Sequence, residues 1–135
     1  MPKTKIYQAY ELPRTVVDLV RAVCADYPRR VQYIKKLEKK ECEDICELDT
    51  LHMCQKLNKI VDEALEPIEE TLRGILLEDI CEKRGYEHSP AANIISKNAY
   101  YMRKRKFLFD IAFRLSLIIA YYESGCHRKI REERC

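Results

Sequence analysis

The feature that most constrains the fold is a long stretch in which apolar residues recur every three to four positions. Between Cys42 and Leu65 they form one stripe, and charged residues fill most positions between them. This spacing places the apolar side chains on one face of an α-helix, whereas a half-buried strand would need strict alternation. The stripe consists of Ile45, Leu48, Leu51, Cys54, Leu57, Ile60, Val61 and Leu65. The segment is therefore predicted to be one long amphipathic helix.

The same spacing predicts a helix on either side of each proline-containing break. Two helices are expected before the stripe, at 13–26 and 29–40, because Pro28 disfavours helical backbone in the residue before it. Pro67 opens a further helix that should end at Gly85. Only three Gly and five Pro occur in 135 residues, too few for the turns of an all-β fold. An all-α fold is predicted.

Two N-cap signals lie close together in the second half of the chain. Ser89 followed by Pro90 predicts a short helix of about two turns that ends near Ile95. Ser96 is a second N-cap candidate, and the apolar residues after it predict a long final helix to about Tyr122. A supporting helix, a short helix, a turn and a long helix follow each other in the order of a helix-turn-helix.

The length of the chain is that of one domain with its own core. We expect a single-domain helical bundle that ends in a helix-turn-helix with a long recognition helix. Residues 1–66 would form an amino-terminal helical part that packs on the rest, 67–124 the helix-turn-helix, and 125–135 a charged tail. The whole is expected to be one compact domain.

Charge is distributed unevenly along the chain, although the net charge is only +3. Residues 1–37 contain eight basic and three acidic residues, and residues 83–135 contain twelve basic and five acidic residues. Between them, residues 38–82 contain five basic and fourteen acidic residues. The acidic residues of the middle are predicted to face solvent rather than to perform catalysis; they include Glu69, Glu70, Glu78, Asp79 and Glu82. A basic block on one predicted helix is typical of a surface that binds a polyanion.

The predicted recognition helix has one polar and basic side. A helical wheel places Asn98, Met102, Arg105 and Lys106 away from the apolar stripe, with Lys97, Tyr101 and Arg103 at its flanks. Asparagine can pair with an adenine edge and arginine with a guanine edge, while free amides at a helix start can hold a phosphate. The predicted base-reading residues are Lys97, Asn98, Tyr101 and Arg105. The predicted phosphate contacts are Lys83, Arg84, Ser96, Arg103, Lys104 and Lys106.

Three segments carry a resemblance to a known family. They are Ile60-Val61-Asp62-Glu63-Ala64-Leu65, Ile80-Cys81-Glu82-Lys83-Arg84-Gly85-Tyr86, and the stretch from Ile95 to Lys106 followed by Asp110-Ile111-Ala112. With the pattern Ser-x-x-x-Tyr-Tyr-x-x-Lys/Arg at its centre, the chain resembles phage-encoded RinA/ArpU-type transcriptional regulators over about residues 60–118. The resemblance implies a fold similar to region four of sigma factors. It also implies a prophage protein that activates late genes for packaging or lysis.

Other functional classes have less support in the sequence. No nucleophile, phosphate-loop or metalloprotease motif is present, so an enzyme is not predicted. Cys42, Cys46, His52 and Cys54 allow a zinc site to be imagined, but these residues are better explained by the apolar stripe, and no metal or cofactor is predicted. The alternative to a DNA-binding regulator is a helical phage adaptor that binds another protein.

The expected partners are double-stranded DNA, RNA polymerase and a second protomer, without a membrane. The seven cysteines have no disulfide-framework spacing and no secretory signal accompanies them, so they are predicted to be reduced thiols. The expected location is the cytoplasm of a bacterial host cell.

Overall fold

The computed structural model describes residues 11–40 and 44–118. Within these ranges the structure contains α-helices and short 3-10 turns but no strand, so the prediction of an all-α fold is confirmed. The helices are α2 (Arg14–Ala25), α3 (Tyr27–Glu38), α4 (Ile45–Leu65), α5 (Glu70–Cys81) and α6 (Lys97–Arg114), with the 3-10 turns η1 (Tyr86–His88) and η2 (Pro90–Asn93) between α5 and α6. None of the described helices is long and apolar enough to cross a bilayer.

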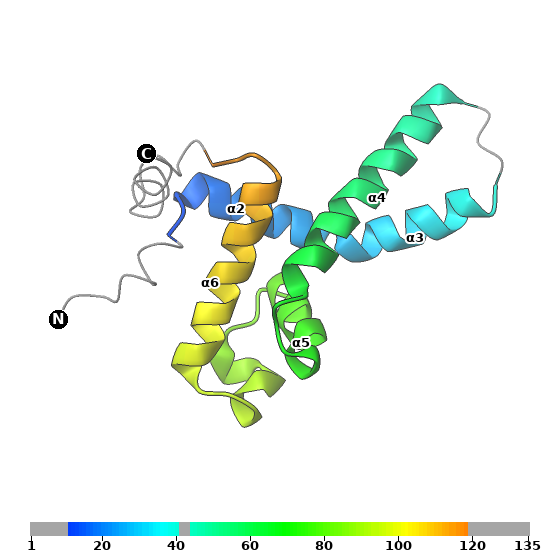
Figure 1. The fold of residues 1–135 in the computed structure, drawn as a ribbon. Helices are drawn as coiled ribbons and strands as arrows, with labels where there is room; N and C mark the ends of the chain where they lie inside the picture. Colours follow the sequence, from blue (N-terminus) through cyan, green and yellow to red (C-terminus); the bar gives the residue numbers. More distant parts are fainter. Residues whose placement is uncertain (1–10, 41–43, 119–135) are drawn as a thin grey trace.

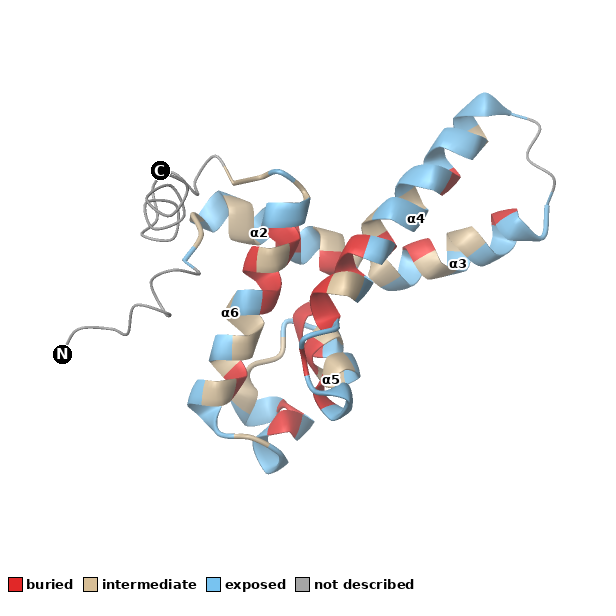
Figure 2. Cartoon of the chain, viewed as in Figure 1, coloured by how far each residue is buried: buried red, intermediate tan, exposed pale blue. Residues whose placement is uncertain are grey.

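The core lies where α2, α5, α6 and the carboxy-terminal half of α4 meet (Figures 1 and 2). Val20 of α2, Val61 of α4 and Ile111 of α6 have no exposed surface at all. Burying such side chains contributes about 1.5 to 3 kcal/mol each. Further core residues are Leu65, Leu72, Leu76, Ile80, Tyr100, Phe107, Leu108 and Ala112.

α3 and the amino-terminal half of α4 form a helical hairpin that projects from this core (Figure 1). Most of its surface is exposed, and Leu37 and Leu51 are its buried apolar side chains before α4 enters the core (Figure 2). Arg30 anchors the base of the hairpin: its Nε donates to Asn58 Oδ1 at 2.6 Å and its guanidinium to the Val23 carbonyl at 2.5 Å. The hairpin therefore depends on the core for much of its stability.

Some helix starts differ slightly from expectation. α3 begins at Tyr27 rather than Arg29, because Pro28 occupies the first turn, where no amide donor is needed. α4 begins at Ile45, and the side chain of Asp44 caps it by accepting from the Cys46 amide at 2.9 Å. Cys42, where the long helix was predicted to begin, lies outside the described residues.

The ends of α5 and α6 correct two predictions. α5 ends at Cys81 rather than Gly85, and α6 ends at Arg114 rather than near Tyr122; residues 119–122 lie outside the described part. Each helix is followed by a non-glycine residue in the left-handed conformation, Lys83 with φ 55° and Ser116 with φ 59°. The amide two residues beyond each C-cap bonds back into the last turn, as in a Schellman motif.

The segment predicted as a short helix of about two turns is instead the single 3-10 turn η2. Ser89 caps it as expected, accepting a hydrogen bond from the Ala91 amide at 3.1 Å. The amides of Ile94 and Ile95 both bond the Ala91 carbonyl and close the turn, and Ser96 then takes an extended conformation and caps α6. The predicted helix-turn-helix and the boundary at residue 66 remain predictions, and the predicted tail at 125–135 lies outside the described residues.

Candidate nucleic-acid interface

The amino-terminal half of α6 carries five basic residues and no acidic one between Lys97 and Lys106. Ser96 begins the helix as predicted, because its Oγ accepts from the Ala99 amide at 3.2 Å. Its side chain is thus used as a cap, and the amides of the first turn beside it remain directed out of the helix end. This half of α6 is the candidate interface.

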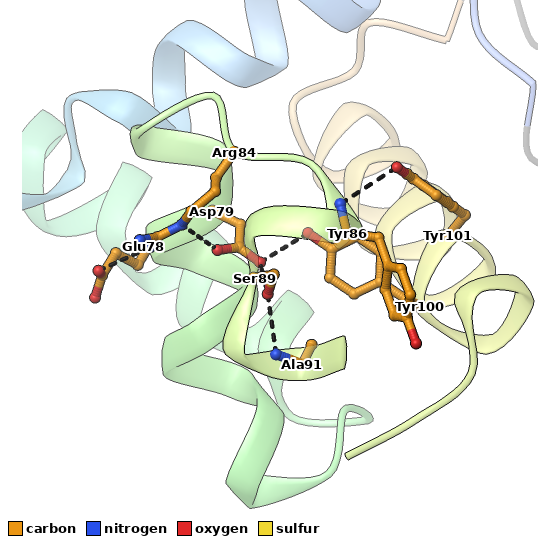
Figure 3. Close-up of polar contacts among 8 residues, drawn as sticks. All are labelled: Glu78, Asp79, Arg84, Tyr86, Ser89, Ala91, Tyr100 and Tyr101. Atoms are coloured by element: carbon orange, nitrogen blue, oxygen red, sulfur yellow. Dashed lines mark hydrogen bonds and ion pairs between the residues drawn. The ribbon is translucent and has the colours of Figure 1, made fainter. Parts of the chain in front are cut away.

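A buried carboxylate connects the candidate interface to the rest of the molecule (Figure 3). Asp79 of α5 has no exposed surface, and its Oδ2 accepts from Ser89 Oγ at 2.5 Å and from the Tyr100 hydroxyl at 2.8 Å. Its Oδ1 accepts from Arg84 Nε at 2.8 Å. Burial, and then the hydrogen bond to Asp79, raise the pKa of Tyr100, so the phenol stays protonated and donates. α5, η2 and α6 are therefore joined at one carboxyl group.

Two further tyrosines hold the turn that precedes α6. The Tyr86 hydroxyl donates to the Ile95 carbonyl at 2.7 Å, immediately before the N-cap. The Tyr101 hydroxyl accepts from the Tyr86 amide at 3.4 Å, and the Tyr86 and Tyr101 rings both pack against Tyr100. Together with Asp79 these contacts determine where α6 starts, which is the preorganisation that a recognition surface needs.

The exposed face of the candidate interface differs in part from the helical-wheel prediction. Asn98, Met102 and Lys106 are exposed, as expected for a face directed away from the core. Arg105 was expected beside them, but it is half-buried and lines a groove between α6 and α2. The wheel placed it wrongly because α2, from the far end of the sequence, covers that side of α6. Tyr101 lines the same groove.

Among the described residues, ion pairs are seen for three of the predicted DNA contacts. Lys97 Nζ lies 3.0 Å from Glu87 Oε1, and Arg103 binds Glu69 with contacts of 2.6 to 2.9 Å. Arg84 is bound to Asp79 and Glu78, each at 2.8 Å. A DNA phosphate would have to displace Glu87 to bind Lys97, and Glu69 to bind Arg103. Arg84 has a structural role that sequence reasoning did not assign.

The remaining predicted phosphate contacts fall into two groups. Lys83 and Lys106 are exposed, so their amines are accessible to a polyanion. Lys104 is half-buried, and its Nζ lies 5.7 Å from the Tyr100 ring centroid and 5.9 Å from that of Tyr101. Burial lowers the pKa of Lys104, and the positive charge of Arg21 lowers it further.

Sequence reasoning missed the residues that organise this surface. Asp79 was predicted to face solvent, but it is fully buried. A signal existed, since Asp79 lies three residues after Leu76 and seven after Leu72, on the apolar stripe of its own helix. Glu69 binds Arg103, which lies 34 positions later in the sequence, and no local sequence pattern predicts such a pair.

Within the described ranges no group of three or more His, Cys, Asp or Glu side chains is arranged to hold a metal ion. Cys42, one member of the zinc site considered from the sequence, lies outside these ranges. No protein-family model, curated protein or solved structure matches the chain. The resemblance to RinA/ArpU-type regulators therefore remains a prediction from the quoted segments.

Proposed function

We propose that the protein binds double-stranded DNA sequence-specifically through the amino-terminal half of α6 and thereby regulates transcription. The observation that carries the proposal is the exposed face of α6, where Asn98, Met102 and Lys106 project from a helix whose start is held by the hydrogen bonds of two tyrosine hydroxyls. An α-helix with a polar and basic face fits the width of the major groove. Asn98 is the strongest candidate for base contact, because it is exposed within the first turn.

The resemblance extends the proposal to a phage or prophage regulator of late genes, with RNA polymerase and a second protomer as partners. The charge distribution supports the DNA part of this proposal. Five cations within ten residues favour phosphate contacts, while Glu69 and Glu87 neutralise two of them in the free protein. Such pairing would restrict non-specific binding, because DNA competes with two carboxylates for Arg103 and Lys97.

The test is selection from a random double-stranded library by the purified full chain, followed by affinity measurements at two salt concentrations. We expect a selected sequence that binds more weakly as salt rises. Asn98→Ala should cost about 1 to 3 kcal/mol at one base pair, and Lys106→Ala should weaken all sequences alike and reduce the salt slope by about 1.

Lys35→Ala is the matched control, since it removes one exposed positive charge from α3, away from α6. It should leave the affinity for the selected sequence nearly unchanged. The absence of any selected sequence would contradict the proposal, and so would equal effects of Asn98→Ala and Lys35→Ala.

The projecting hairpin favours a second candidate function, a helical adaptor that binds another protein. Ile45, Leu48 and Met53 on the outer part of α4 are 76%, 40% and 53% exposed. Exposed apolar side chains on a projecting element are typical of protein-interaction surfaces. This candidate predicts no salt-dependent DNA affinity, so the library selection separates it from the first.

A further inference from the structure

A groove of about 440 Å³ lies between α2 and α6, beside the candidate interface. Val17 of α2 and Leu108 of α6 supply apolar walls, and Tyr101 contributes its ring and hydroxyl. Three cations also line it: Arg21 from α2, and Lys104 and Arg105 from α6. Among the described lining residues Glu11 supplies the carboxylate, so cations outnumber anions in this part of the groove.

Arg21 and Lys104 form no ion pair with the part of the chain that the structure describes. In residues 11–40 and 44–118 no carboxylate forms a salt bridge with either side chain. Lys104 is half-buried against two tyrosine rings. Burial lowers its pKa, the charge of Arg21 lowers it further, and the charge of Asp79 opposes this shift without forming an ion pair. Arg21 is exposed and Lys104 half-buried, and because both line one groove their like charges would be stabilised by an anion bound between them.

We propose that this groove binds a phosphate group, held by Arg21 of α2 together with Lys104 and Arg105 of α6. A guanidinium group can bind phosphate oxygens in bidentate fashion, and the lysine adds a point charge from the opposite helix. The source we favour is a backbone phosphate of DNA bound by α6, because Lys104 and Arg105 belong to the same half of that helix. This choice of source rests on the proposed function; the phosphate site itself does not.

α2 then has a role that the sequence did not indicate. Arg21 lies more than seventy positions before the basic run of α6, and only the packing of α2 on α6 brings it to the groove. A phosphate held by both helices would fix the orientation of the whole core on its ligand. Phosphate contacts commonly have this positioning role in protein–DNA complexes.

The experiment compares two probes on the full chain and two variants. Pyrophosphate is titrated into isotopically labelled protein, with amide NMR shifts recorded and sodium chloride used to match ionic strength. The affinity for double-stranded DNA is measured separately at constant salt. Arg21→Gln tests the groove. Arg14→Gln is the control, because it removes one arginine charge from the same helix but lies outside the groove, paired with Asp18.

We expect saturable shifts in α2 and α6 with pyrophosphate, weakened at least about tenfold by Arg21→Gln, as for the loss of one charge-assisted hydrogen bond. Arg14→Gln should match the wild type. An equal loss of DNA affinity in Arg21→Gln identifies the backbone as the phosphate source. Arg21→Gln could instead lose pyrophosphate binding while DNA affinity is unchanged or no DNA binds at all. That result would identify a free phosphate compound as the ligand, and the phosphate site in the groove would still be supported.

The proposal is overturned if Arg21→Gln and Arg14→Gln behave alike with both probes. It is also overturned if the pyrophosphate shifts follow ionic strength without saturation and DNA affinity does not depend on Arg21. Thermal unfolding followed by circular dichroism checks that both variants fold. Because Arg21 is exposed, its replacement should leave the unfolding midpoint nearly unchanged.

Discussion

Asp79 accepts hydrogen bonds from side chains of three different segments and has no contact with solvent. A buried carboxylate is costly unless its oxygens are paired, and here Arg84, Ser89 and Tyr100 pair them. The cluster contains an acid, a hydroxyl and a phenol, which in a cleft would suggest catalysis. Because it is closed to solvent and fully hydrogen-bonded, its role is to hold the start of α6 against α5.

Tyr100→Phe tests this role. Removing the hydroxyl leaves Asp79 with one donor fewer in a buried site, so the free energy of unfolding should fall by about 1 to 3 kcal/mol. Urea denaturation followed by circular dichroism measures the change. Tyr33→Phe on α3 is the control, because the Tyr33 hydroxyl makes no hydrogen bond with any described residue. Equal stabilities of the two variants would argue against a structural role for the Asp79 cluster.

At the scale of elements, the end of α5 sets the path of the chain that leads to the candidate interface on α6. α5 ends in a Schellman motif in which the Arg84 amide donates to the Asp79 carbonyl at 2.7 Å and Lys83 takes the left-handed conformation. A side chain with Cβ pays a penalty there that glycine does not. The turn also directs the Arg84 side chain back to Asp79, so the helix end and the buried cluster support each other.

Lys83→Gly should therefore stabilise the protein. Relief of the left-handed strain is partly offset by the greater freedom of glycine in the unfolded chain, and we expect a net gain of about 0.5 to 1 kcal/mol. The midpoint of thermal unfolding measures it. Lys83→Ala removes the same charge but keeps Cβ, so it should show no such gain. A stabilisation of the same size in both variants would mean that charge, not backbone conformation, is responsible.

At the scale of the molecule, the described residues form a well-packed core and a projecting hairpin (Figures 1 and 2). The core buries residues from α2, α4, α5 and α6, whereas α3 and the outer half of α4 bury few apolar side chains. Local stability follows apolar burial, so the two parts should open with different free energies. The candidate interface lies on the better-packed part, and the exposed apolar side chains of α4 on the less well-packed part.

Hydrogen exchange provides the corresponding measurement. Amides between Leu48 and Cys54 should exchange through local opening at lower free energy than those between Phe107 and Ala112, which we expect to exchange only with global unfolding. Native-state exchange in increasing denaturant separates the two classes. Equal protection in both segments would show that the hairpin is as stable as the core.

The sequence by itself determined the all-helical class and the approximate position of each described α-helix. Apolar spacing and cap residues such as Ser96 are local, and their information lies within a few turns of the chain. The sequence also located the basic run of α6 and the exposure of Asn98 and Lys106. It did not locate the end of α5, because Lys83 takes a conformation that glycine usually takes.

Only the tertiary structure decided which polar residues are used within the molecule. Asp79 meets Tyr100, Glu69 meets Arg103, and Arg21 reaches the groove beside Arg105, each from a distant part of the chain. Burial and ion pairing depend on which helices pack together, and a helical wheel contains no information about the neighbouring helix. Local pattern thus determined the helices, while packing decided which cations on α6 remain accessible to a ligand.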